Sequence, residues 1–70
     1  MIVHAFEIGA RVEVYTDATG KMQWTRAIIQ KHEPYRGAPG YYVNYPDARE
    51  MHECHGGWIP GHLVRRGDRP

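Results

Sequence analysis

The sequence predicts an all-β protein, a small barrel of five short and strongly bent strands. No window combines apolar residues at three- and four-residue spacing with an N-cap and a glycine stop, as an amphipathic helix would. Eight glycines and five prolines interrupt the 70 residues every few positions, which is typical of short strands joined by tight turns. Five strands without a helix can protect their edges by curling into a barrel, the smallest all-β solution at this length.

The first strand is predicted at residues 10–15. Val12 and Val14 point to one face of such a strand and the residues between them point to the other, which is the alternation of a half-buried strand. Residues 16–21 (TDATGK) follow with turn-forming chemistry, because aspartate accepts backbone hydrogen bonds and glycine tolerates left-handed conformations. The chain is therefore expected to reverse here.

The second strand is predicted from about residue 23 to residue 31. With the same alternation, Ala27 and Ile29 face the core beside the valines of the first strand. The opposite face then carries Trp24, Arg26 and Ile28.

Three shorter strands complete the predicted barrel. Residues 33–40 (EPYRGAPG) hold two prolines and two glycines, which predicts a loop. Residues 41–45 follow as a third strand rich in aromatic and β-branched side chains. A fourth strand is expected at residues 58–59, a single tight turn at 60–62, and a closing fifth strand at 63–66.

Composition predicts one small domain over residues 1–70, with the barrel at about 8–66 and a flexible basic tail at 67–70. No apolar run approaches the roughly 20 residues that a membrane span needs. The N-terminus lacks the charged start and long apolar stretch of a secretory signal. The single cysteine excludes an internal disulfide and fits a reducing compartment. We therefore expect a cytoplasmic protein with no membrane partner.

Short motifs along the predicted strands, taken in order, resemble a known family. They are I-G at 8–9, V-E-V at 12–14, W-x-x-A-x-I at 24–29, Y-V-N-Y at 42–45, W-I-P at 58–60 and L-V-R at 63–65. In this order and spacing they resemble the Tudor and Agenet domains, which are SH3-like barrels. The resemblance covers about residues 8–66 and implies a five-stranded Tudor-like barrel with a short turn before the last strand.

The resemblance also implies a ligand site. Tudor domains generally bind methylated lysine or arginine in an aromatic cage through cation–π attraction. The matching positions here are Tyr15, Trp24 and Tyr45, with Asp47 as a nearby carboxylate. Ala48 stands where cage-forming members tend to place another aromatic residue, so the cage is incomplete.

These residues lead us to expect a non-catalytic binding module. Its aromatic surface groove would bind a peptide or cationic segment of a partner protein. The competing interpretation is that Trp24 and Tyr45 are barrel-wall residues, half packed and half exposed. Trp58, beside Ile59 and Pro60 in the closing segment, is expected to pack in the core.

Nucleic-acid binding is the main alternative, since small barrels bind single strands with a basic groove and stacking aromatic rings. Arg26, Arg65 and Arg66 are the expected phosphate contacts. The formal net charge of only +1 argues against it unless the charges are unevenly distributed. A third alternative is a structural subunit that associates with itself through a strand edge; the oligomeric state is left open.

Metal binding and catalysis are not expected. Residues 46–57 contain His52, Cys54 and His55, which are weak metal candidates because zinc usually takes two well-separated pairs of ligands. Cys54 and His55 are also a poor nucleophile and base, because sequence neighbours point apart and no third group is evident to orient the base. We therefore predict no cofactor and no enzymatic activity.

Overall fold

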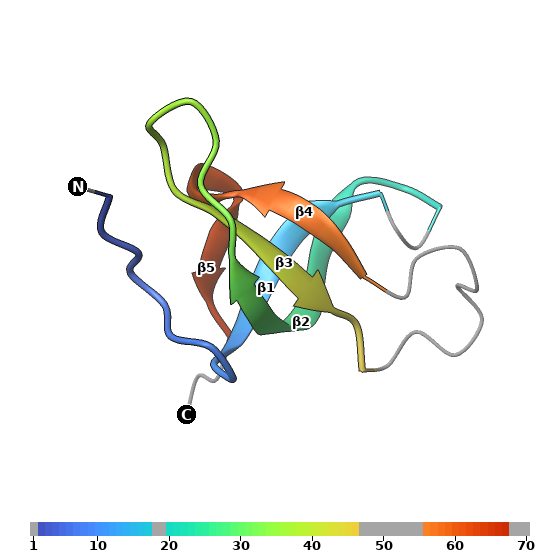
Figure 1. The fold of residues 1–70 in the computed structure, drawn as a ribbon. Coiled ribbons are helices and arrows are strands. Elements are labelled where there is room, and N and C mark those ends of the chain that lie inside the picture. The colour runs from blue at the N-terminus through green and yellow to red at the C-terminus, as the bar shows by residue number, and fades with distance from the viewer. Residues whose placement is uncertain (1, 18–19, 47–55, 68–70) are drawn as a thin grey trace.

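Five antiparallel strands form one strongly curled sheet, a half-barrel consistent with a small SH3-like barrel (Figure 1). The computed structural model describes residues 2–17, 20–46 and 56–67. The strands are β1 (Arg11–Thr16), β2 (Gln23–His32), β3 (Gly40–Asn44), β4 (Gly56–Pro60) and β5 (Val64–Arg66), and a 3-10 turn, η1 (Gly61–Leu63), precedes β5. They are arranged in the order β4-β3-β2-β1-β5.

The predicted fold class is confirmed, and each of the five predicted strands is present with both ends within two residues of the prediction. The largest difference is at the start of β4. That strand was expected at residues 58–59 and begins at Gly56, because Gly56 and Gly57 pair with Asn44 and Val43 of β3. Leu63 belongs to the 3-10 turn rather than to the last strand.

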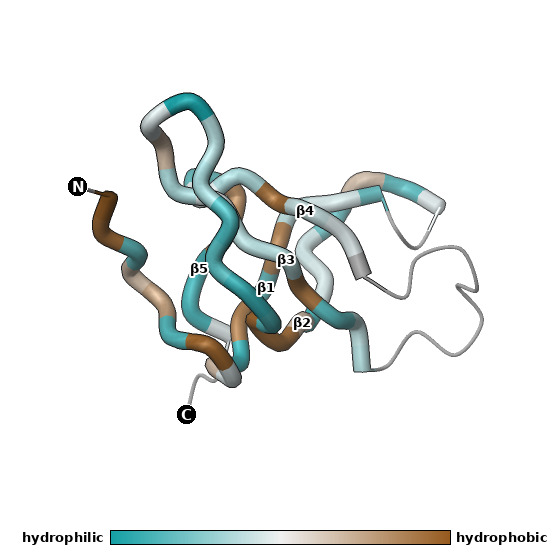
Figure 2. Tube along the Cα trace, viewed as in Figure 1, coloured by the Kyte–Doolittle hydropathy of each residue, from teal (hydrophilic) through white to brown (hydrophobic). Residues whose placement is uncertain are grey.

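The core lies on the concave face of the sheet and follows the predicted alternation. Val12 and Val14 of β1 and Ala27 and Ile29 of β2 are almost completely buried. The remaining buried apolar side chains are Tyr41, Val43, Tyr45, Ile59 and Val64. These residues are spread over all five strands or their ends. Figure 2 shows that the apolar residues lie in several short segments along the chain. No single segment could bury its own apolar face, so the strands are stable only together.

Strand β2 pairs with β1 on one side and with β3 on the other, and it contains a bulge. Its first six residues pair with β1, from Gln23 opposite Thr16 to Ile28 opposite Arg11. Its last residues pair with β3, and the register shifts between Ile29 and Lys31. An extra residue in one strand bends it and increases its twist. The bulge therefore accounts for the curl between the β1–β2 and β2–β3 pairs.

The N-terminal segment (residues 2–10) is attached to the sheet, although the barrel was expected to begin at about residue 8. The Gly9 N–H donates to the Ile29 carbonyl at 2.8 Å. Farther out, His32 Nε2 donates to the Phe6 carbonyl at 2.7 Å, and the Phe6 N–H donates to the Tyr41 hydroxyl at 3.3 Å. Figure 1 shows this segment running along the outside of the strands to the N-terminus.

Two histidine rings and a tyrosine hold the outer part of this segment. The rings of His4 and His32 stack with centroids 4.2 Å apart and planes 5° apart. Both rings meet the buried ring of Tyr41 edge-on. His4 Nε2 also lies 3.1 Å from the Gly40 carbonyl, so the cluster joins the N-terminal segment to the start of β3.

No helix in the part of the chain that the structure describes is long and apolar enough to cross a membrane.

Candidate ligand-binding pocket

Two of the predicted ligand residues lie together on the outer face of the sheet. Tyr15 of β1 and Trp24 of β2 are cross-strand partners, and their ring centroids are 5.4 Å apart. The rings point outward because Val14, next to Tyr15, and Ala27, three residues after Trp24, point into the core. Tyr15 is 36% exposed and Trp24 is 38% exposed.

A cation of the protein itself covers the Trp24 ring. The guanidinium carbon of Arg65 lies 3.9 Å from the ring centroid, within the range of a cation–π interaction. Arg65 Nε also donates to Glu13 Oε1 at 2.8 Å. A ligand cation would have to displace Arg65 or use the other side of the ring.

The other two predicted ligand residues do not join this pair among the described residues. Tyr45 is only 7% exposed and belongs to the core, because it continues the inward alternation of Tyr41 and Val43 along β3. That alternation was readable in the sequence. Asp47 lies outside the described residues. The role of these four residues as a ligand site stays a prediction.

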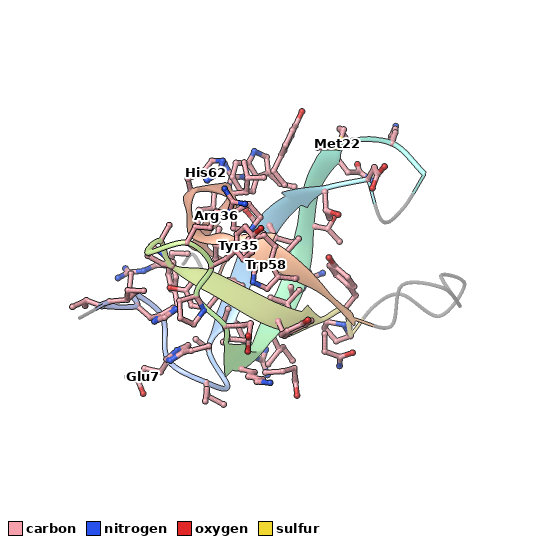
Figure 3. The ribbon with its side chains drawn as sticks, turned by 45° about the horizontal axis from the view of Figure 1, so that its top comes forward. Glu7, Met22, Tyr35, Arg36, Trp58 and His62 are labelled. Carbon is pink, nitrogen blue, oxygen red and sulfur yellow. The ribbon has the colours of Figure 1, made fainter. Side chains whose placement is uncertain are left out.

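A different group of aromatic residues forms a pocket at the other end of the sheet. It has a volume of about 280 Å³ and is lined by Glu33, Pro34, Tyr35, Tyr42 and Trp58. Tyr35 and Trp58 lie side by side near the β2–β3 loop in Figure 3, and their ring centroids are 6.0 Å apart. None of these five residues was among the predicted ligand residues.

Strand pairing brings the pocket residues together. Tyr42 of β3 and Trp58 of β4 are cross-strand partners on the outer face, and Tyr42 is 42% exposed. Trp58 was expected in the core, but it is half-buried and is not among the buried core residues. The adjacent tyrosines at 41 and 42 were a usable signal, since successive strand residues point to opposite faces and one ring had to face outward.

A hydrogen bond and a close backbone contact hold the indole of Trp58 in place. Its Nε1 donates to the Glu33 carbonyl at 2.8 Å. Gly40 lies against the same ring, and a Cβ built there would come within 2.5 Å of Trp58 Cζ2 and 2.6 Å of the Glu33 carbonyl oxygen. Only glycine therefore permits this approach of β3 to the indole, and the wall of the pocket is preorganised.

The loop over the pocket is a two-residue hairpin turn, in the segment predicted as a loop. Tyr35 and Ala38 exchange backbone hydrogen bonds of 3.0 and 3.1 Å. Arg36 and Gly37 between them have φ values of +53° and +80°, as a type I′ turn requires. Arginine is an unusual residue in this left-handed conformation. The turn presents the ring of Tyr35, which is 59% exposed.

Charged groups already surround the pocket rings. Lys31 Nζ lies 5.6 Å from the Tyr42 centroid and 3.3 Å from Glu33 Oε1. The Arg36 guanidinium lies 5.4 Å from the Tyr35 centroid, and its Nε donates to the Tyr35 hydroxyl at 3.2 Å. The two tyrosine rings therefore attract cations in this structure, and a carboxylate is present beside them.

The structure also brings together two of the arginines predicted to contact nucleic acid. Arg26 of β2 and Arg65 of β5 are the cross-strand partners of Glu13 on its two sides, so they share the outer face with Trp24. Arg66 is exposed and pairs with Val12 at the next position of β5.

The weak metal candidates His52, Cys54 and His55 lie outside the described residues. Within residues 2–17, 20–46 and 56–67, no group of three or more His, Cys, Asp or Glu side chains is placed to hold a metal ion.

Comparison with protein-family models, with curated proteins and with solved structures found no significant match for this chain.

Proposed function

We propose that this protein is a non-catalytic binding module that takes a cationic side chain of a partner peptide into the pocket of Tyr35, Tyr42 and Trp58. The observation that supports this most strongly is the pocket itself, which is open to solvent and walled by three aromatic rings with a carboxylate beside them. The resemblance to Tudor domains supports the same class of ligand, a methylated lysine or arginine, at a different set of residues.

Two interactions favour a cation in this pocket. Each ring face contributes about 0.5–2 kcal/mol to binding a cation, and more when water is excluded. The Glu33 carboxylate is partly exposed and pairs with Lys31 at 3.3 Å, so it favours a ligand cation that takes the place of the Lys31 ammonium. A methylated ammonium suits the pocket better than the native Lys31 ammonium does, because methyl groups remove hydrogen-bonding protons and reduce the cost of leaving water.

Preorganisation lowers the cost of binding. The indole of Trp58 is fixed by its hydrogen bond to Glu33, and Tyr35 is presented by a tight turn. Fewer rotamers are therefore lost when a ligand enters. The ligand competes with Lys31, which also pairs with Glu33, and with Arg36, which also donates to the Tyr35 hydroxyl. Both of these side chains are at exposed positions.

An NMR titration that follows the two indole N–H signals tests this proposal. The ligands are three versions of one short peptide, carrying lysine, trimethyllysine or the neutral tert-butyl isostere of trimethyllysine. We expect the trimethyllysine peptide to shift the Trp58 signal and to bind most tightly, because only it combines a positive charge with easy desolvation. The Trp24 signal should stay in place.

Variants of the pocket provide the second arm. Tyr42→Ala should weaken trimethyllysine binding by about two- to thirty-fold, the affinity equivalent of one cation–π contact. Tyr15→Ala removes a comparably exposed ring from the other site and is the matched control. Equal binding of the neutral isostere, or a response of Trp24 without Trp58, would contradict the proposal.

A further inference from the structure

We infer that the outer face of β1, β2 and β5 binds single-stranded nucleic acid, independently of the pocket. We call this surface the arginine–aromatic face. It consists of Arg11, Glu13, Tyr15, Trp24, Arg26 and Arg65. None of these residues lines the pocket, so the inference does not depend on the proposed function.

Charge is concentrated on this face. Three arginines and one glutamate give it a formal charge of +2, although the whole chain carries only +1. The register places Arg26, Glu13 and Arg65 side by side across β2, β1 and β5. Arg11 lies two residues before Glu13 on the same face of β1. The uneven distribution that nucleic-acid binding requires of a nearly neutral chain is therefore present.

Two aromatic rings adjoin the arginines. Tyr15 and Trp24 occupy the next outward-facing positions along β1 and β2, and each is more than one-third exposed. Exposed rings beside cations are the two components of single-strand recognition, since bases stack on the rings while the cations contact phosphates. Because Arg65 covers one side of the Trp24 ring, a base would stack on Tyr15 or on the other side of Trp24.

Arg65 connects the two components. Its guanidinium stacks on Trp24, while its Nε donates to Glu13 at 2.8 Å. A guanidinium has five N–H donors in a planar fork, so this contact leaves further donors for a phosphate. Because stacking and pairing already order the side chain, little rotamer freedom is lost when the phosphate binds.

The combination favours a single strand over other anionic partners. A duplex keeps its bases stacked on one another, so it would use the arginines and leave Tyr15 and Trp24 exposed. An acidic peptide would also satisfy only the charges. A single strand is the ligand that uses both the cations and the ring faces.

Fluorescence anisotropy with a fluorescein-labelled, mixed-sequence 12-nucleotide single strand tests the inference. Contacts from three arginines predict a slope of about −2 for log K against log salt. Affinity should therefore fall about 20-fold between 50 and 200 mM salt. Arg11→Gln should reduce the magnitude of the slope by about 0.7, since it removes one phosphate contact without touching Trp24.

Trp24 variants test the stacking component. Trp24→Ala should weaken binding by about 5- to 150-fold, whereas Trp24→Phe should retain most of it, which also guards against a folding defect in the alanine variant. Tyr42→Ala changes a ring of the pocket and should leave the affinity for the strand unchanged. A duplex of the same sequence and poly-glutamate are the competitor arms.

Three outcomes would overturn the inference. The first is the absence of binding at 50 mM salt by the folded protein. The second is that the duplex or poly-glutamate competes as effectively as the unlabelled single strand, which would mean that the face binds anions through charge alone. The third is an affinity that does not change in Trp24→Ala. Since the pocket is tested with a methylated peptide and with Tyr42→Ala, either proposal can fail while the other stands.

Discussion

At the scale of single residues, the pocket depends on one glycine. Gly40 is buried between the indole of Trp58 and the carbonyl of Glu33. It also accepts a backbone hydrogen bond from Glu33 at 2.9 Å. The absence of a side chain at Gly40 allows the loop, β3 and β4 to meet closely enough for the Trp58 N–H to reach Glu33. Rings that line a surface pocket are thus positioned by a residue that does not line it.

Gly40→Ala is predicted to destabilise the protein by about 1–3 kcal/mol, because overpacking a tight site forces the backbone or the indole to move. Urea unfolding measures the loss. Gly57→Ala is the matched control: Gly57 lies in β4, and a Cβ there would meet nothing within 4 Å, so its effect should be much smaller. Equal losses in the two variants would show that the contact with Trp58 is not the cause.

At the scale of elements, the N-terminal segment is an addition to the five strands. Its attachment depends on the His4–His32 stack and on the reciprocal contacts of Phe6 with His32 and Tyr41. His4 also reaches Gly40, the residue that lies against the Trp58 indole. The segment therefore supports the start of β3, from which both the core ring of Tyr41 and the pocket ring of Tyr42 arise.

His32→Ala is predicted to loosen this segment while the sheet remains folded. Loss of one hydrogen bond and of two ring contacts, with His4 and Tyr41, costs about 1–3 kcal/mol together and should speed hydrogen exchange at the Phe6 amide by about 5- to 150-fold. The Gly9 amide, which donates to Ile29, should change much less. His62→Ala, at an exposed position of η1, is the control, and an unchanged Phe6 amide in His32→Ala would contradict the assigned role.

At the scale of the whole molecule, a thin core supports two separate surfaces. A chain of this length has little stability to spare, roughly 0.05–0.15 kcal/mol per residue. All its strands contribute to one cluster of buried side chains. The pocket lies where β3, β4 and the β2–β3 loop meet, and the arginine–aromatic face lies on β1, β2 and β5. Both are outer faces of the same sheet, so their residues can be changed without opening the core.

Substitutions of two adjacent isoleucines test whether the inner and outer faces of β2 contribute differently to stability. Ile29→Val should cost about 0.5–1.5 kcal/mol, since it removes a methylene group from a fully buried side chain. Ile28→Val, one residue earlier on the outer face of β2, should cost less than about 0.5 kcal/mol. Urea midpoints measure both, and equal shifts would mean that the inner and outer faces are not distinct in energy.

The strands and the core could be read from the sequence because they depend on local periodicity. The alternation of Val12 with Val14 and of Ala27 with Ile29 assigned the inner face of both strands correctly, and the Gly- and Pro-rich segments marked the turns. Tyr45 was predicted as a ligand residue, but the same alternation, continued from Val43, places its ring in the core.

The sites were decided by tertiary structure, because a site needs residues that are distant in sequence to meet on one outer face. Which ring lies beside Trp58 depends on the pairing of β3 with β4 and on the shape of the loop at Tyr35. Arg65 reaches Trp24 only because β5 returns to pair with β1, which places it against Glu13, 52 positions away in the sequence. Alternation within a strand determines the face of each side chain; register and curl between strands determine its neighbours, and no local pattern encodes them.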